Sequence, residues 1–131
     1  MILDSSAIVA ILLHQPDAES LLDAIAEADA VGVGAPTLLE SAIVVAARLG
    51  AAARAVPLEF VREGDIEILP FGEHHLVCAI EAFERYGKGR HRAALNFGDC
   101  LAYATAYIAD QPLLFVGNDF TLTDIRPAMH G

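Results

Sequence analysis

The sequence lacks any long hydrophobic run, although 55% of its 131 residues are hydrophobic. A membrane-spanning helix needs roughly 20 consecutive apolar residues, and Asp, Glu, Arg or Pro interrupts the apolar stretches well before that length. No basic leader with an apolar secretory segment precedes the first predicted strand. The sequence therefore predicts a protein that does not enter a membrane, and we expect it in the cytoplasm.

Cysteine is scarce, with two residues, Cys78 and Cys100. Their separation does not match the spacing of cysteine metal ligands, and both lie in patterns typical of helices. We therefore expect small, buried core residues rather than a disulfide or a thiolate metal site.

Basic residues are also few, because 8 Lys and Arg stand against 18 Asp and Glu, giving a formal net charge of −10. Taken alone, this balance argues against nucleic-acid binding, which needs Lys and Arg at phosphates. However, half of the basic residues fall in one short stretch that contains Arg85, Lys88, Arg90 and Arg92. A local positive field can therefore exist on an acidic chain.

Missing residues exclude one enzyme class and disfavour a second. A dinucleotide-binding loop needs three glycines in the spacing Gly-x-Gly-x-x-Gly, but Gly32 and Gly34 are followed by Pro36 and no third glycine. A phosphatase of the haloacid dehalogenase type has a second Asp two residues after the first. Here Ser6 occupies that position after Asp4, and no downstream Lys matches.

Apolar patterns predict strands alternating with helices along one domain of residues 1–131. Such alternation is typical of a parallel sheet with helices on both faces. We therefore predict an α/β fold, a three-layer α/β/α sandwich around a mainly parallel sheet of four to five strands. The predicted strands cover 1–3, 30–35, 66–69, 113–116 and 123–125, and the predicted helices cover 5–13, 17–28, 36–49, 51–63, 73–86 and 98–109.

Four acidic residues stand where a predicted strand or loop leads into a helix, namely Asp4, Glu40, Asp99 and Asp119. The carboxyl ends of parallel strands share one edge of the sheet, where ligands bind. Each Asp alone could be a helix cap, and a Glu near a helix start is favoured by the helix dipole. A cap needs no second acid across the sheet, so the joint pattern favours a site for a divalent cation.

Carboxylates without nearby Cys or His suit Mg²⁺ or Mn²⁺ rather than Zn²⁺. The common chemistry of such sites is phosphodiester hydrolysis by water, with one or two cations. The sequence leaves the number of cations open.

With these acids in these positions, the chain resembles a PIN domain, and specifically the VapC toxin ribonucleases of bacterial toxin–antitoxin pairs. The resemblance covers essentially the whole chain and is most specific in the last third. It lies in the segments 1–7, 85–92, 95–100 and 114–120, with Thr123-Asp124-Ile125.

The resemblance implies roles for single residues. Asp4, Glu40, Asp99 and Asp119 match the acidic quartet of the family, and Ser6 matches the hydroxyl that supports the first Asp. Asn118 is a supporting residue that some relatives replace by Asp, so Asp119 is a direct ligand, a water-mediated ligand or a turn residue. Asp124 is expected to be a polar residue beside an edge strand.

The resemblance also implies an activity and partners. The activity is Mg²⁺-dependent endonucleolytic cleavage of RNA, with Mn²⁺ able to substitute. The partners are the RNA substrate, a cognate VapB-type antitoxin and a second copy of the chain. Residues 87–92 form a predicted basic loop, and within it Lys88, Arg90 and Arg92 are the expected contacts to RNA. The alternative is a catalytically degenerate PIN domain that only binds RNA or protein, which the presence of all four acids disfavours.

Overall fold

Four short parallel strands form a single sheet in the computed structural model, which describes residues 1–129. Their order across the sheet is β3-β2-β1-β4, and Ile2 of β1 lies opposite both Gly32 and Leu113. The strands are β1 Ile2–Leu3, β2 Gly32–Gly34, β3 Glu67–Leu69 and β4 Leu113–Leu114.

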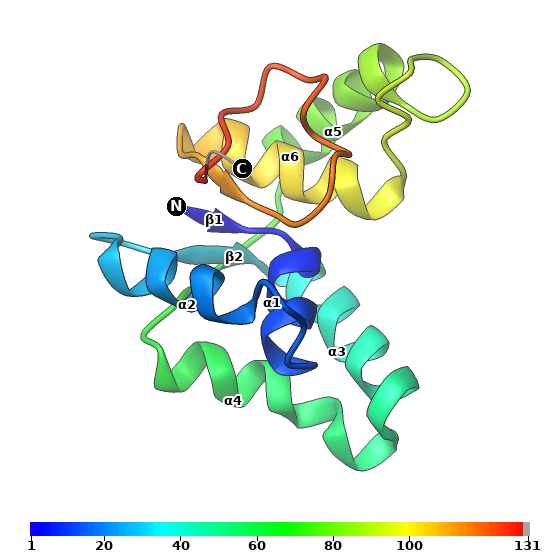
Figure 1. Ribbon diagram of the computed structural model, residues 1–131. Helices are drawn as coiled ribbons and strands as arrows, with labels where there is room; N and C mark the ends of the chain where they lie inside the picture. The colour runs from blue at the N-terminus through cyan, green and yellow to red at the C-terminus, as the bar shows by residue number, and fades with distance from the viewer. Residues whose placement is uncertain (130–131) are drawn as a thin grey trace.

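Helices cover both faces of this sheet, as predicted for a three-layer sandwich. Figure 1 shows α5 and α6 on one face and α1 to α4 on the other. The helices are α1 Ser5–Leu12, α2 Ala18–Glu27, α3 Ala35–Leu49, α4 Val56–Glu63, α5 Glu73–Tyr86 and α6 Phe97–Ala109, with a short 3-10 helix, η1, at Ala51–Ala55. No helix within residues 1–129 is long and apolar enough to cross a bilayer.

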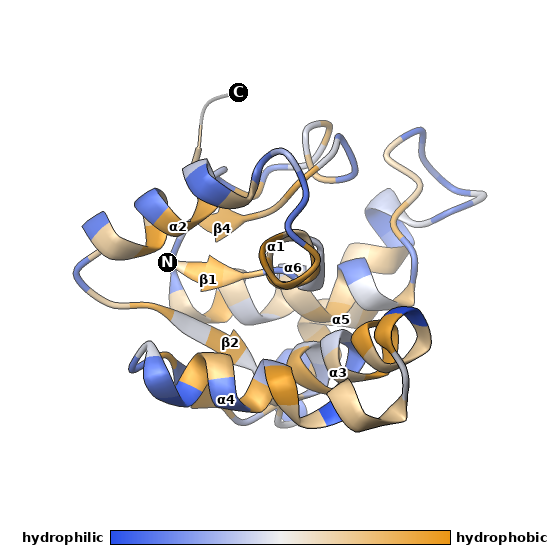
Figure 2. Cartoon of the chain, turned by 60° about the horizontal axis from the view of Figure 1, so that its bottom comes forward, coloured by the Kyte–Doolittle hydropathy of each residue, from blue (hydrophilic) through white to orange (hydrophobic). Residues whose placement is uncertain are grey.

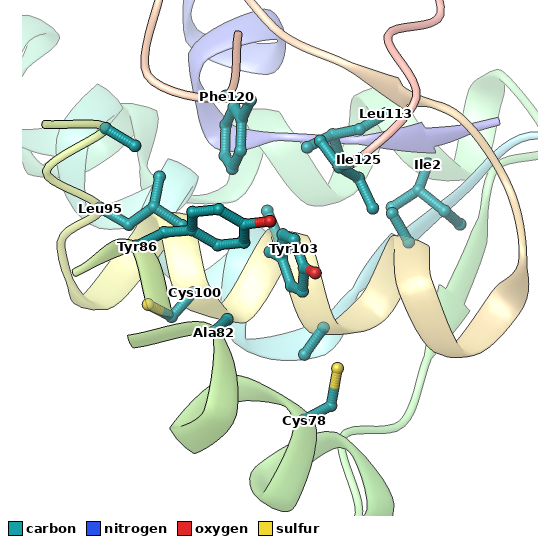
Figure 3. Packing of buried hydrophobic residues seen from close by; sticks show 14 residues of the cluster. Ile2, Cys78, Ala82, Tyr86, Leu95, Cys100, Tyr103, Leu113, Phe120 and Ile125 are labelled. Carbon is teal, nitrogen blue, oxygen red and sulfur yellow. The ribbon is translucent and has the colours of Figure 1, made fainter. Parts of the chain in front are cut away.

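The two faces of the sheet contact two separate hydrophobic clusters. Ile2 and Leu113 belong to the cluster around α5 and α6, part of which is drawn in Figure 3. Leu3 and Leu114 belong to the cluster around α1, α2 and α4. Successive strand residues point to opposite faces, and in Figure 2 β1 and β4 are hydrophobic while hydrophilic residues lie on the outer sides of α2 and α4. Burial on both faces explains the high hydrophobic content.

The predicted fifth strand over 123–125 is wrong. The segment consists of bends that follow a turn at 119–122, and an isolated bridge between Leu113 and Pro127 links the chain to the sheet just after it. The Thr121 hydroxyl donates to the Asn118 carbonyl at 2.8 Å, and the Thr123 hydroxyl donates to the Phe120 carbonyl at 2.8 Å. Such local bonds offer the backbone an alternative to a sheet ladder. Asp124 consequently lies in an irregular segment, which is bonded to the edge strand β4 through the Leu113 N–H and the Arg126 carbonyl at 2.9 Å.

The helix predicted over 51–63 also differs, because it divides into η1 and α4. Pro57 stands in the first turn of α4, where its missing N–H is tolerated. A helix continuous through position 57 would lose that hydrogen bond, so the division falls just before the proline.

The chain reverses its direction across the sheet between β1 and β4. It passes from β1 to β2 and β3 on one side, then returns to place β4 on the other side of β1. In open α/β sheets, ligands bind beyond the carboxyl ends of the strands at such a switch point. Asp4, which follows β1, lies at this position. So does the segment of residues 115–125 after β4, which we call the turn segment.

Candidate functional site

Asp4 is the most buried of the four acids, with 3% of its surface exposed. It is the N-cap of α1, and its Oδ2 accepts hydrogen bonds from the Ser6 backbone N–H at 3.1 Å and the Ser6 hydroxyl at 2.6 Å. Its Oδ1 is also buried and has no hydrogen-bond partner within residues 1–129. Capping therefore occupies one carboxylate oxygen and leaves the second available.

Ser6 connects Asp4 to the other side of the switch point. Its hydroxyl donates to Asp4 and accepts a hydrogen bond from the backbone N–H of Val116 at 3.0 Å. Val116 follows β4 and precedes the turn that carries Asn118 and Asp119. The supporting position predicted for Ser6 is therefore part of a chain of hydrogen bonds between the two strands.

Asp99 lies in the first turn of α6 and forms a reciprocal capping box with Asn96. Its Oδ2 accepts from the Asn96 backbone N–H at 3.0 Å, and the Asn96 Oδ1 accepts from the Asp99 N–H at 2.9 Å. No role was predicted for Asn96 from the sequence, although the Asn-x-x-Asp spacing resembles a capping box. The box orients a carboxylate that is 9% exposed.

Glu40 reaches the site from α3, and its carboxylate lies against Gly98 of α6. A Cβ atom built at position 98 would lie 2.8 Å from Glu40 Cδ, closer than real Cβ contacts. Glu40 Oε1 is buried without a hydrogen-bond partner in the described part of the chain. Gly98 thus makes room for Glu40 beside Asp99. This role was missed, and its only sequence signal is a glycine in the first turn of a helix.

We predict that Gly98→Ala separates activity from stability. In a helix, alanine is more favourable than glycine by about 1 kcal/mol. The atoms nearest to the added Cβ belong to the flexible end of the Glu40 side chain. Thermal unfolding should therefore shift little, while displacement of Glu40 should reduce the RNA cleavage that the family resemblance implies by roughly 10-fold or more. A Gly98→Ala variant with wild-type cleavage would contradict the role given to this contact, and Gly72→Ala, where a Cβ meets nothing within 4 Å, is the control.

The four acids interact electrostatically. Burial raises the pKa of Asp4 to about 6, against the hydrogen bonds from Ser6, and the charges of Asp99 and Glu40 raise it further. Burial also raises the pKa of Asp99 to about 6, against the hydrogen bond from Asn96, with the charges of Asp119 and Glu40 adding to the rise. The structure therefore brings the predicted acids to one edge of the sheet. Asp119 is the outer member, exposed on a turn.

These raised pKa values predict an unusual pH dependence of stability. A carboxyl group whose pKa is higher in the folded state contributes stability that is present below its unfolded pKa, near 3.8, and is lost as pH rises through about 6. For Asp4 the loss is on the order of 3 kcal/mol. Without divalent cations, the unfolding temperature of wild type should therefore fall, relative to Asp4→Asn, as pH rises from 4 to 7.

The measurement is thermal unfolding of both proteins across this range in the presence of EDTA. Added Mn²⁺ should reduce or reverse this relative loss, because a cation that binds the charged carboxylates lowers their pKa in the folded state and stabilises the folded wild type. Parallel curves for the two proteins at all pH values would contradict the prediction.

The carboxylates are not close enough together in this structure to coordinate one metal ion as a group. Among residues 1–129, no three His, Cys, Asp or Glu side chains are grouped closely enough to hold a metal ion. The chemistry of the donors nevertheless fits a hard cation, since two buried oxygens, Asp4 Oδ1 and Glu40 Oε1, are unpartnered and oxygen ligands suit Mg²⁺ and Mn²⁺. The cation site therefore stays a prediction.

The basic loop 87–92 is attached to the chain just before the capping box. The Lys88 N–H donates to the Leu95 carbonyl at 2.9 Å, and the Leu95 N–H donates to the Tyr86 carbonyl at 2.9 Å. Lys88, Arg90 and Arg92 are exposed, and the Arg90 guanidinium lies 5.7 Å from the centre of the Phe83 ring. The loop is therefore tied to the residue before Asn96, and its role in RNA binding stays a prediction.

An apolar groove runs beside the acids, between α3 and α5. Two adjoining cavities of about 420 and 580 Å³ share Phe71, Leu76, Phe97 and Leu101, and the larger one also includes Glu40. We call the exposed apolar side chains around it the α3–α5 face; they are Leu39, Ile43, Leu76, Ile80 and Phe97. A cavity of about 660 Å³ at the opposite edge, around Met1, contains none of the four acids.

Comparison with known proteins matches this architecture to one family. The family model for the PIN domain matches residues 1–125. Ribonuclease VapC36 of Mycobacterium tuberculosis is 47% identical over 127 residues, covering 96% of this chain and 91% of the relative. Ribonuclease VapC of Mycolicibacterium smegmatis is 42% identical over 131 residues, covering 99% of this chain and 100% of the relative.

Solved structures share the fold at low sequence identity. The toxin VapC20 of Mycobacterium tuberculosis, which cleaves the sarcin-ricin loop, superposes with a TM-score of 0.77 at 13% identity and covers 95% of each chain. A chain of VapBC2 from Rickettsia felis, bound to a DNA fragment from its promoter, has a TM-score of 0.71 at 18% identity, covering 96% of this chain and 94% of that one. These likenesses bear on the fold alone.

Proposed function

Because this chain belongs to the PIN domain family and to its VapC ribonucleases, we propose that it is the ribonuclease toxin of a toxin–antitoxin pair and hydrolyses RNA phosphodiester bonds with a divalent cation. The observation that carries the proposal is the pair of buried acids, Asp4 and Asp99, at the switch point of the sheet. Burying these two carboxylates without a compensating positive charge costs free energy. A bound cation would reduce this cost.

Asp4, Glu40 and Asp99 would hold Mg²⁺, or Mn²⁺ in its place, with Asp119 as the outer member. When bound, the cation would supply positive charge at the scissile phosphate and lower the pKa of a water molecule. The residues of the chain provide orientation. Hydrogen bonds from Ser6 fix Asp4, the capping box with Asn96 fixes Asp99, and Gly98 admits Glu40. No Ser, Cys or His nucleophile is needed.

The direct test is cleavage of total RNA by the purified protein in Mg²⁺, in excess EDTA, and after Mg²⁺ is restored. We expect cleavage that EDTA abolishes and Mg²⁺ recovers, with the cut sites mapped by sequencing the new RNA ends. Cleavage that persists in EDTA would refute the role of the cation. RNA binding without cleavage in all conditions would favour the alternative of a degenerate binding domain.

The basic loop is proposed to contact the RNA backbone through Lys88, Arg90 and Arg92. Replacing Arg90 and Arg92 together by Ala should weaken RNA binding at low salt. The plot of log affinity against log salt should become shallower by roughly 1.5, since each phosphate contact contributes about 0.7 to 0.9. The matched control replaces the exposed Arg48 and Arg54, which lie elsewhere on the chain. An unchanged slope would remove the loop from the RNA site.

A cognate VapB-type antitoxin is the proposed protein partner. This rests on the VapC relatives and on the fold shared with the toxin of the VapBC2 complex. Copurification of the toxin with the product of the neighbouring antitoxin gene, and loss of RNA cleavage in the complex, is the test. We expect the antitoxin to occlude the site, and an antitoxin that binds without inhibiting cleavage would refute this.

We further propose that the chain is a homodimer and that the second copy covers the α3–α5 face. Phe97 is 79% exposed, and Leu39 and Ile43 are each 61% exposed. Leu39 and Ile43 lie on α3 and Phe97 lies at the start of α6. All three line one apolar groove rather than standing singly on the surface. Contiguous apolar patches of this kind are typical of interaction sites.

A further inference from the structure

The turn segment after β4 is fastened to α6 by one side-chain hydrogen bond. The Tyr103 hydroxyl donates to Asp124 Oδ1 at 2.6 Å, across 21 residues of sequence. Tyr103 is 3% exposed and belongs to the same buried cluster as Tyr86 and Ile125, as Figure 3 shows. The bond therefore joins a rigid core residue to a segment that has no regular secondary structure.

The same carboxylate also faces the end of α5. Asp124 Oδ2 lies 3.8 Å from an Arg85 guanidinium nitrogen, and that guanidinium lies 4.9 Å from the centre of the Tyr86 ring. An exposed ion pair of this length contributes little by itself. Here, however, it acts on a carboxylate that Tyr103 already orients, and Arg85 is two residues before the basic loop.

The three segments that meet at Asp124 are those that carry the proposed site. Asp99 and Tyr103 are one helical turn apart on α6, so their positions are rigidly coupled. Asp119 stands on the turn segment five residues before Asp124, with the buried Phe120 between them. Asp119 is exposed on this turn, and the hydrogen bonds from Thr121 to the Asn118 carbonyl are local to the turn. The bond from Tyr103 to Asp124 gives the same turn segment a fixed point on α6.

We propose that Asp124 is a positioning residue for RNA cleavage, which through Tyr103 holds the Asp119 turn against the helix that carries Asp99. The proposal rests on the proposed ribonuclease function. Asp124 does not contact the substrate in this proposal; it acts through Asp119. Tyr103 is the fixed point, and Arg85 extends the contact to the basic loop.

The test compares Tyr103→Phe, which removes only the hydroxyl, with Asp124→Ala and Asp124→Asn. Tyr103→Phe and Asp124→Ala should lower kcat on the RNA substrate by roughly 10-fold, with KM little changed, because small misplacements of catalytic groups are costly. Asp124→Asn keeps an oxygen acceptor for Tyr103 and should recover most of this loss. In an Asp119→Asn background, Tyr103→Phe should cost nothing further, since coupled residues are not additive.

A second readout does not depend on activity. Hydrogen exchange of backbone amides should become faster in residues 117–125 of Tyr103→Phe, and remain unchanged in α1. The matched control is Asp110→Asn, which removes the charge of another exposed Asp, one that pairs with Arg126 at 3.2 Å. We expect wild-type cleavage and wild-type exchange at 117–125 in this control.

Two results would overturn the positioning role. One is a kcat within twofold of wild type for both Tyr103→Phe and Asp124→Ala. The other is an equal loss in the Asp119→Asn background, which would indicate a general structural effect. If wild type itself cleaves no RNA, the proposed function fails and the catalytic role fails with it, while the exchange data still report whether Tyr103 fastens the turn.

Discussion

The Asp99→Asn variant should lose RNA cleavage by roughly 100- to 1,000-fold and yet fold at least as stably as wild type. The loss follows from removing one of the charges that would hold the cation. The stability follows because Asn retains an oxygen that can accept the hydrogen bond from the Asn96 N–H. It also removes a buried charge that lies within range of Glu40 and Asp119. The measurements are RNA cleavage in Mg²⁺ and thermal unfolding without divalent cations at pH 7.

Asp4→Asn should behave in the same way, since an amide oxygen can still accept from Ser6. The matched control is Asp65→Asn, an exposed position with φ of 52°, a backbone conformation that both Asp and Asn tolerate. We expect full cleavage by this control. Cleavage retained in Asp99→Asn, or a lower unfolding temperature than wild type in EDTA, would contradict the assignment.

The Ile43→Glu variant should dissociate the proposed homodimer, raising its Kd by roughly 100-fold or more. Ile43 is already exposed in the single chain, so a charge there has little effect on folding. In the dimer the same carboxylate would be removed from water without a partner, which is costly. Sedimentation of both proteins over a dilution series measures the change.

The control for this variant is Leu22→Glu on α2, an exposed apolar residue that does not line the groove. It should leave the Kd unchanged. Wild type that sediments as a monomer at every concentration would refute the homodimer, and equal dissociation by both variants would move the interface away from the α3–α5 face.

Topology made most of the site predictable from the sequence. The apolar pattern at residues 1–3 and 113–116 predicted two strands of one parallel sheet, and the carboxyl ends of such strands share an edge. Asp4 and Asp119 could therefore be brought together without any knowledge of packing. The capping box of Asn96 and Asp99 is likewise a local feature and could have been found from spacing alone.

The contacts that the sequence did not predict are non-local or lie in irregular segments. Glu40 meets Gly98 only because α3 and α6 pack together, and no periodicity reports which turns of two distant helices touch. The strand predicted over 123–125 was wrong because threonine hydroxyls bond locally to the backbone there. The contact between Asp124 and Tyr103 could not be predicted either, because it joins an irregular segment to a helix residue 21 positions earlier in the chain.

The capping bonds of Asp4 and Asp99 have a consequence for the survival of bacteria that carry this gene. A cell producing the active toxin without its antitoxin is under selection to inactivate it. Aspartate and asparagine codons differ by a single base, and asparagine can keep either cap. Escape mutants should therefore accumulate at codons 4 and 99 as intact, well-folded proteins. Such proteins could still occupy the antitoxin and would compete with an active copy for it.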